Sequence, residues 1–298
     1  MRFILLFASL FLFSCNKDDN EQIIPTVDDL TATIEYNQID GIDSNLLSLD
    51  IYYNNETNIQ KPVIVYVHGG GWSIGDKSSQ IENKINLFRS LNYILISVNY
   101  RLSPFPFDIS NPNRIKYPDH NNDIADALLW IYDNIGQYGG NKNKIGLLGH
   151  SAGAHLVALT GTNGSFLESK GLSLSNIKGV AVIDTEGFDI NEQVMNGDNQ
   201  NMYINAFGTD IAQNVNASPI YNVINTISYP KFLIAKRGNS QRIQYANDFI
   251  NILEANGVSV SQVNGSIYDH SGINNAIGEP NETLITNMLK DFLVECFE

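Results

Sequence analysis

The chain has 298 residues, of which 43% are hydrophobic and 17% charged, and its formal net charge is −14. This length and composition are typical of one large globular domain. The acidic charge argues against nucleic acid as a partner, because nucleic-acid sites need clustered Lys and Arg. With two cysteines, and five histidines that form no HExxH pattern, the sequence lacks the signature of a disulfide framework or a metal site.

The first 14 residues have the pattern of a signal peptide. Arg2 precedes an apolar run over residues 3–13, which is too short to span a bilayer because a spanning helix needs about 20 apolar residues. The run ends in Leu-Phe-Ser-Cys at residues 12–15, which resembles a bacterial lipobox. This resemblance implies cleavage before Cys15 and lipidation of its thiol.

Residues 15–30 are predicted to form a polar tether after the lipidated cysteine. The Asn-Lys-Asp-Asp-Asn segment at 16–20 resembles the surface-export signal of outer-membrane lipoproteins in certain Gram-negative bacteria. A plain solvated linker is the alternative, since short charge runs usually have no other role. We expect a secreted, lipid-anchored protein of the outer membrane, and the membrane face and the oligomeric state stay open.

Residues 31–298 are predicted to form a single domain in which strands and helices alternate. Runs rich in aliphatic and β-branched residues indicate strands at 46–53, 62–67, 93–98, 144–148, 177–183, 230–235 and 259–263. Apolar residues at three- and four-residue spacing indicate helices at 80–91, 123–135, 154–160, 241–255 and 283–297. Such alternation predicts an α/β fold with a mostly parallel sheet covered by helices on both faces, without a large cap domain.

A Gly149-x-Ser151-x-Gly153 motif lies between the predicted strand at 144–148 and the following helix. This is the pattern of a nucleophile elbow, in which a sharp turn raises the serine hydroxyl above the sheet. The flanking glycines are needed because side chains there would collide with neighbouring elements. The motif therefore predicts Ser151 as a nucleophile.

The sequence His68-Gly-Gly-Gly-Trp72 follows the strand at 62–67. With this motif before the serine motif, residues 45–297 resemble the α/β-hydrolase family, and within it the HGGG-type carboxylesterases related to hormone-sensitive lipase. The resemblance implies an oxyanion hole built from the backbone N–H groups of Gly70, Gly71 and Ala152. It also implies that neither a metal nor an organic cofactor takes part.

His270 lies between the last predicted strand and the last predicted helix, where this fold carries its catalytic base. The other histidines either belong to the two motifs (His68, His150) or are expected to be structural (His120, His155). The acid of these esterases usually follows the strand at 230–235, but no carboxylate occurs there before Asp248.

We predict Asp184, after the strand at 177–183, as the acid that orients His270. The alternatives are Asp189 on the same loop, Asn239 as a neutral substitute, or Asp184 as a helix cap only. Asp269, next to the base in the chain, is expected to point elsewhere.

The motifs together predict a serine carboxylesterase that works through an acyl-enzyme. The polar, Asn-rich segment between 183 and 230 lacks a long apolar lid, which favours short acyl groups, such as acetyl or feruloyl decorations of polysaccharides. The predicted partner is thus a small ester or an esterified glycan. Two alternatives are an arylformamidase-like amidase and a catalytically inactive glycan-binding lipoprotein, the latter suggested by the missing acid after residue 235.

Overall fold

The structure is a computed structural model that describes residues 28–56 and 58–298. The predicted signal peptide, Cys15 and most of the predicted tether lie outside these residues. The last two tether residues, 29 and 30, instead open strand β1 (Asp29–Glu35), which is antiparallel to its neighbour in the sheet. The predicted boundary at residue 31 is therefore two residues late. The strand is mostly exposed, so it lacks the continuous apolar run by which the buried strands were recognised.

Eight strands form one sheet in the order β1-β2-β4-β3-β5-β6-β7-β8. Strand β2 is antiparallel to both of its neighbours, β1 and β4, and all other pairs are parallel. The remaining strands are β2 (Ser48–Asn54), β3 (Lys61–Val67), β4 (Ile94–Val98), β5 (Gly140–His150), β6 (Ile177–Ile183), β7 (Lys231–Lys236) and β8 (Val260–Asn264). The predicted mostly parallel sheet is confirmed.

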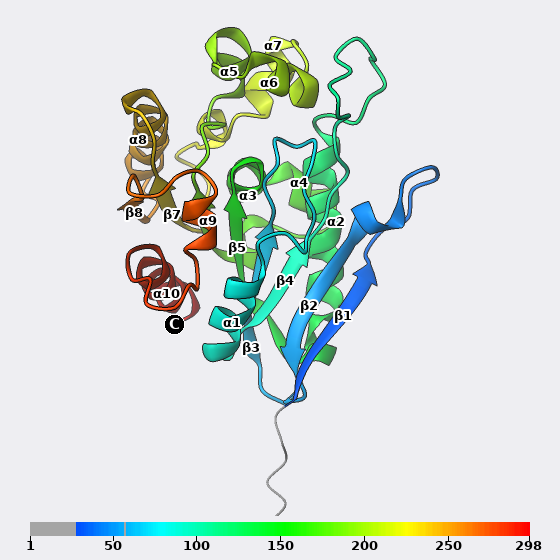
Figure 1. Cartoon of the computed structure of the whole chain (residues 1–298), viewed down its shortest axis with the longest axis vertical. Helices are drawn as coiled ribbons and strands as arrows, with labels where there is room; N and C mark the ends of the chain where they lie inside the picture. Colours follow the sequence, from blue (N-terminus) through cyan, green and yellow to red (C-terminus); the bar gives the residue numbers. More distant parts are fainter. Residues whose placement is uncertain (1–27, 57) are drawn as a thin grey trace, which may run out of the picture.

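Helices cover both faces of this sheet (Figure 1). The helices are α1 (Glu82–Ser90), α2 (Asp119–Asn134), α3 (Ala152–Thr162), α4 (Ser165–Glu168), α5 (Ile190–Asn196), α6 (Gln200–Phe207), α7 (Ile211–Asn216), α8 (Ser240–Ala255), α9 (Gly272–Asn275) and α10 (Leu284–Phe297). Among the helices of the described residues, none is both long and apolar enough to cross a bilayer.

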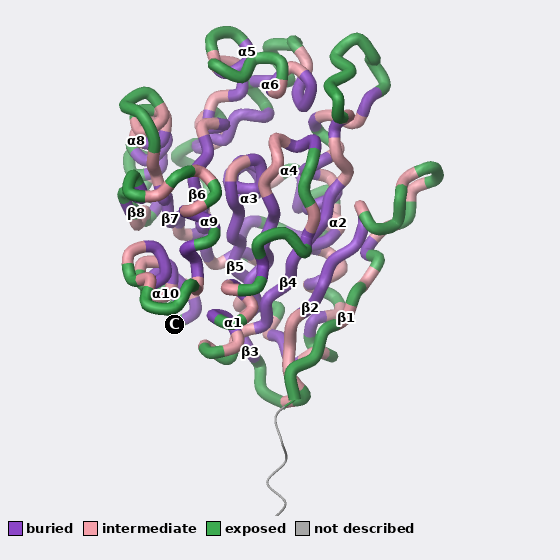
Figure 2. The backbone as a smooth tube through the Cα atoms, in the orientation of Figure 1, coloured by how far each residue is buried: buried purple, intermediate pink, exposed green. Residues whose placement is uncertain are grey.

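The hydrophobic core consists of two clusters, one on each face of the sheet. The larger cluster joins α2, α3 and α8 to the sheet, and the smaller one joins α1 and α10 to the opposite face. Figure 2 shows the central strands and α3 as almost continuously buried. Strands buried on both faces are expected to be apolar along their whole length, which explains why β3, β4 and β6 were recognisable from sequence.

The segment between β6 and β7 folds into three short helices, α5, α6 and α7, at the top of Figure 1. They lie beyond the carboxyl ends of the parallel strands and form a small cap. Helices of six to eight residues span about two turns, so their apolar spacing is too short to recognise as periodic. The sequence excluded a large cap domain, and the small one was not predicted.

Candidate active site

Ser151 occupies a strained turn between β5 and α3. Its backbone has φ 56° and ψ −119°, a conformation that is costly for a residue with a side chain. A Cβ at Gly149 would lie 2.3 Å from the carbonyl oxygen of Gly153, and one at Gly153 would lie 2.1 Å from that of Val67. The two motif glycines are thus required by the tight approach of β5, α3 and β3, which fixes the serine at the edge of the sheet.

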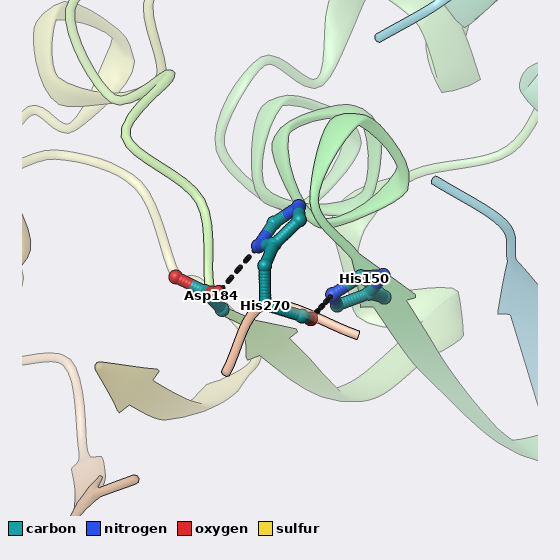
Figure 3. A group of neighbouring side chains, drawn as sticks. All are labelled: His150, Asp184 and His270. Carbon is teal, nitrogen blue, oxygen red and sulfur yellow. Dashed lines mark hydrogen bonds and ion pairs between the residues drawn. The ribbon is translucent and has the colours of Figure 1, made fainter. Parts of the chain in front are cut away.

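His270 lies within hydrogen-bond distance of the serine. It sits in the loop between β8 and α9, and its Nε2 is 2.9 Å from Ser151 Oγ. Its backbone carbonyl accepts a hydrogen bond of 2.8 Å from Nε2 of His150. Burial lowers the pKa of His150 to about 3, so this ring is a neutral donor at physiological pH. His150, which precedes the serine in the motif, thereby holds the loop that carries His270 (Figure 3).

Asp184 is the carboxylate that reaches His270. Its Oδ2 lies 2.6 Å from Nδ1 of the imidazole, as drawn in Figure 3. Asp184 directly follows β6 with φ 51°, and its N–H donates to the carbonyl of Ala235 at 2.9 Å. Burial alone would raise the pKa of this carboxyl group, but the hydrogen bond with His270 and the charge of Arg242 lower it to about 2. Asp184 is therefore ionised throughout the working range of an enzyme.

The other candidates for the acid have different partners. Asp189 caps α5 by accepting from the Glu192 N–H and also accepts from the Tyr221 hydroxyl. Asn239 caps α8, and Asp269 accepts from the N–H of Gly272. From the sequence, Asp184 could have been a helix cap only. In the structure the residue that caps α5 is Asp189.

The three residues of the predicted oxyanion hole line the same cavity as Ser151. Gly70 has φ 116° and Gly71 has φ 59°, and a Cβ at Gly70 would lie 2.0 Å from the carbonyl oxygen of Ile74. Ala152 is the first residue of α3, so its N–H has no acceptor within the helix. The loop after β3 and the start of α3 thus present donors beside the serine hydroxyl.

Helix α6 of the cap packs directly on the oxyanion loop. The indole of Trp72 is buried against the rings of Tyr203 and Phe207, with centroid separations of 5.2 and 4.9 Å. The side-chain amide of Asn205 donates to the hydroxyl of Ser73 at 3.1 Å and to the carbonyl of Pro104 at 3.0 Å. The position of the glycine loop therefore depends on the cap.

A cavity of about 570 Å³ opens above the serine. Beside the groups already described, it is lined by apolar side chains such as Ile74 and Met202, and by polar ones including Glu186. A second cavity, of about 360 Å³, adjoins it and shares Glu186, Asn199 and Arg242 with it. Its other lining residues are Glu192, Gln193, Asn196, Gly197, Asp198, Asn239, Gln241 and Tyr245, nearly all of them polar.

Sequence reasoning missed two arginines at this site. Arg237 and Arg242, from the end of β7 and the first turn of α8, both form ion pairs with Asp184. Both lie in the segment that follows the strand that usually precedes the acid in this fold. Two cations at that place indicate that a carboxylate from a neighbouring strand pairs with them.

His150, Asp184 and His270 are close enough together for a metal ion, with candidate ligand atoms within 4.8 Å of one another. However, both ring nitrogens of His270 contact Ser151 or Asp184, and both oxygens of Asp184 already accept from cations or from His270. A metal would have to displace these contacts, so the donor set fits a hydrogen-bonded chain better than a metal site. His120 and His155, predicted to be structural, are fully buried away from this group.

Comparison with known proteins gives both a family and a fold. The family model described as BD-FAE matches residues 49–247, more than half of the chain. The match includes the glycine loop, Ser151 and Asp184 and ends before His270. Esterase LipQ of Mycobacterium tuberculosis is 38% identical over 98 residues, which are 33% of this chain and 21% of that protein. The probable carboxylic ester hydrolase LipM of the same organism is 34% identical over 113 residues, or 37% of this chain and 24% of that protein.

The chain thus spans about a quarter or less of the length of these curated relatives. Among solved structures, esterase B from Lactobacillus rhamnosis superposes with a TM-score of 0.70 at 22% identity, covering 90% of this chain and 86% of that one. Esterase 2 of Thermogutta terrifontis gives 0.68 at 19% identity, with coverages of 89% and 94%. The chain therefore belongs to the BD-FAE family, and its fold is the α/β-hydrolase fold that the sequence predicted.

Proposed function

We propose that the protein is a serine carboxylesterase in which Ser151 is the nucleophile, His270 the base and Asp184 the acid. The observation that carries this proposal is the continuous chain of hydrogen bonds from Ser151 Oγ through both nitrogens of His270 to Asp184. The names of the relatives support it, since LipQ, LipM and the superposed structures are described as esterases or ester hydrolases.

The proposed reaction is acyl transfer through the serine. His270 takes the proton of Ser151 as the hydroxyl oxygen attacks the ester carbonyl, and Asp184 stabilises the imidazolium that results. The oxyanion accepts hydrogen bonds from the N–H groups of Gly70, Gly71 and Ala152. His270 then gives its proton to the departing alcohol, and a water molecule, deprotonated by the same ring, releases the acid and restores Ser151.

Hydrolysis of p-nitrophenyl acetate by residues 16–298 tests the triad. We expect Ser151→Ala to lower kcat by about 10⁴-fold or more, and Asp184→Asn by about 10⁴-fold, because an amide stabilises the wrong tautomer of the base. Asp189→Asn is the matched control and should retain wild-type kcat, since Asp189 caps α5. Wild-type turnover by a folded Ser151→Ala variant would exclude the proposed nucleophile, and wild-type turnover by Asp184→Asn would exclude the proposed acid.

For the substrate we propose short acyl esters, such as acetyl or feruloyl groups, on a polyhydroxylated leaving group. The second cavity supports this, because carboxylate and amide side chains such as Glu192 and Asn196 bind hydroxyl groups well. Acetylated and feruloylated glycans should be turned over and long-chain triglyceride should not. The reverse result would contradict this substrate class and leave the triad proposal standing. The alternative of an inactive glycan-binding protein loses its support, because it rested on a missing acid.

We further propose that the protein is secreted and held at the outer membrane through lipid on Cys15. The support is the run of residues 1–15 described above, where an apolar stretch of signal-peptide length ends at a cysteine. Growth with labelled palmitate should label the wild type and leave Cys15→Ser unlabelled. Equal labelling of both would exclude Cys15 as the lipid site.

A further inference from the structure

The carboxylate of Asp184 accepts hydrogen bonds from three side chains at once. Its Oδ2 accepts from Nδ1 of His270 and also from Nε of Arg237. Its Oδ1 accepts from Nη2 of Arg242 at 2.7 Å. Only 2% of the Asp184 side chain is exposed, so solvent screens these contacts weakly. The acid that faces the base is thus also paired with two permanent positive charges.

Arg242 is itself held by two carboxylates on the loop that follows β6. Its Nη1 pairs with Oε2 of Glu186, while its Nη2 reaches Asp184. The planar guanidinium therefore bridges two acids two residues apart and fixes the direction of both. Arg237 and Arg242 both line the cavity above the serine, close to the reacting groups.

The charges of the Asp184 cluster beside His270 come from three elements and cancel, because two carboxylates pair with two guanidinium groups. Asp184 and Glu186 follow β6, Arg237 follows β7, and Arg242 belongs to α8. His150, at the end of β5, is neutral because burial lowers its pKa to about 3. Two further ionisable side chains lie nearby. Asp269 precedes His270 and is exposed on the same loop, whereas Lys84 of α1 is fully buried, and this burial lowers its pKa to about 7. Without the arginines, the carboxylate that contacts the imidazole would have no cation paired with it.

We propose that Arg237 and Arg242 are positioning residues for the reaction, which direct Asp184 toward His270 and reduce the basicity of that imidazole. A carboxylate alone stabilises the protonated ring, and cations paired with the carboxylate oppose this stabilisation. The kinetic part of this inference rests on the proposed esterase function.

The pH dependence of kcat/KM on p-nitrophenyl acetate tests the charge effect. In Arg242→Met and Arg237→Met we expect the acidic limb to move to higher pH by about 0.5 to 1 unit, since a cation near the base is lost. In Arg242→Lys and Arg237→Lys, which keep the charge, the limb should stay near that of the wild type. A purely structural role would lower kcat and leave the limb in place, and that result would overturn the proposal.

Arg89→Met is the matched control, because Arg89 pairs with Asp29 at 3.5 Å at the far edge of the sheet. It changes the net charge equally and should not move the limb. An equal shift in this control would assign the effect to overall charge and contradict the proposal. If Arg242→Met does not fold, Arg242→Gln, whose amide can still donate to Asp184, should show the same shift.

A titration of the His270 ring by NMR separates this inference from the proposed function, because it needs no turnover. It is measured in the Ser151→Ala background with and without Arg242→Met. We expect the midpoint to rise when the arginine is removed. An unchanged midpoint in the folded variant would overturn the proposal even for an active esterase. A raised midpoint in a protein that hydrolyses no ester would uphold it and contradict the proposed function.

Discussion

The proposed nucleophile and the proposed acid, Ser151 and Asp184, both have positive φ although neither is glycine. Each directly follows a parallel strand, β5 or β6, and each is held by a backbone hydrogen bond to the next strand. The Ser151 N–H donates to the carbonyl of Ile183 at 3.0 Å, and the Asp184 N–H donates to that of Ala235 at 2.9 Å. The sheet thus stabilises two locally unfavourable conformations that direct the two side chains toward His270.

A substitution at Gly70 tests the role of the glycine loop. In Gly70→Ala, the new Cβ would lie 2.0 Å from the backbone oxygen of Ile74, so the loop must move and its N–H groups lose their direction. We expect kcat to fall by about 10²–10³-fold. Gly171→Ala is the control, since Gly171 also has positive φ, +75°, but nothing lies within 4 Å of its Cβ position. Unchanged kcat in Gly70→Ala would exclude this loop from the oxyanion hole.

At the scale of elements, helix α6 of the cap packs on the loop that carries the predicted oxyanion hole. Asn205 of α6 is fully buried, and its amide donates to Ser73 and Pro104. Its removal leaves the buried Ser73 hydroxyl and the partly buried Pro104 carbonyl without this donor. Asn205→Ala should therefore lower the free energy of unfolding by about 1–3 kcal/mol and raise KM for esters, as measured by denaturant unfolding and by kinetics. Asn201→Ala, at an exposed position of the same helix, should change neither, and equal effects in both variants would contradict the role of Asn205.

The elements also show where sequence reasoning succeeds and where it fails. Buried strands such as β3 and β6 are apolar over most of their length, so they were predictable. The glycines of the elbow were predictable because side chains at those positions would clash with neighbouring backbone. The cap helices were not, because each is too short to show a helical period. The identity of the acid was ambiguous, because the sequence offers four candidate side chains in loops near the base: Asp184, Asp189, Asn239 and Asp269. Only the register of the sheet, which sets Ile183 beside Ala235, brings Asp184 to His270.

At the scale of the whole molecule, buried neutral histidines make stability depend on pH. Burial lowers the pKa of His155 to about 4 and that of His120 to about 3, from an ordinary value of 6.5. Below about pH 6.5 the unfolded chain binds protons that the folded chain does not. The free energy of unfolding therefore falls as the pH drops from about 6.5 toward 4, by up to about 1.4 kcal/mol per pH unit for each such group.

His155→Gln isolates one of these contributions. The imidazole Nε2 lies 2.9 Å from the carbonyl of Ala217, a contact that a glutamine amide can replace without titrating. Between pH 7 and 5, the variant should lose about 2 kcal/mol less stability than the wild type. Val157→Ala, a buried change on the same helix, should keep the wild-type pH dependence. Denaturant unfolding at both pH values measures this, and parallel losses in all three proteins would exclude the histidine as the cause.

The location of Asp184 at the end of β6 has a consequence for how this scaffold can diverge. The loop that leads to the first cap helix, which begins at Ile190, starts directly after Asp184, so the proposed acid and the cap share one continuous segment. If the acid followed β7 instead, exchange of the cap would leave the segment that carries the acid unchanged. Here, exchange of the whole segment after Asp184 would alter the backbone next to the proposed acid. It would also remove Glu186, the second carboxylate that pairs with Arg242. New specificities in this chain should therefore arise by substitutions within the cap, and chimaeras should keep at least residues 184–189.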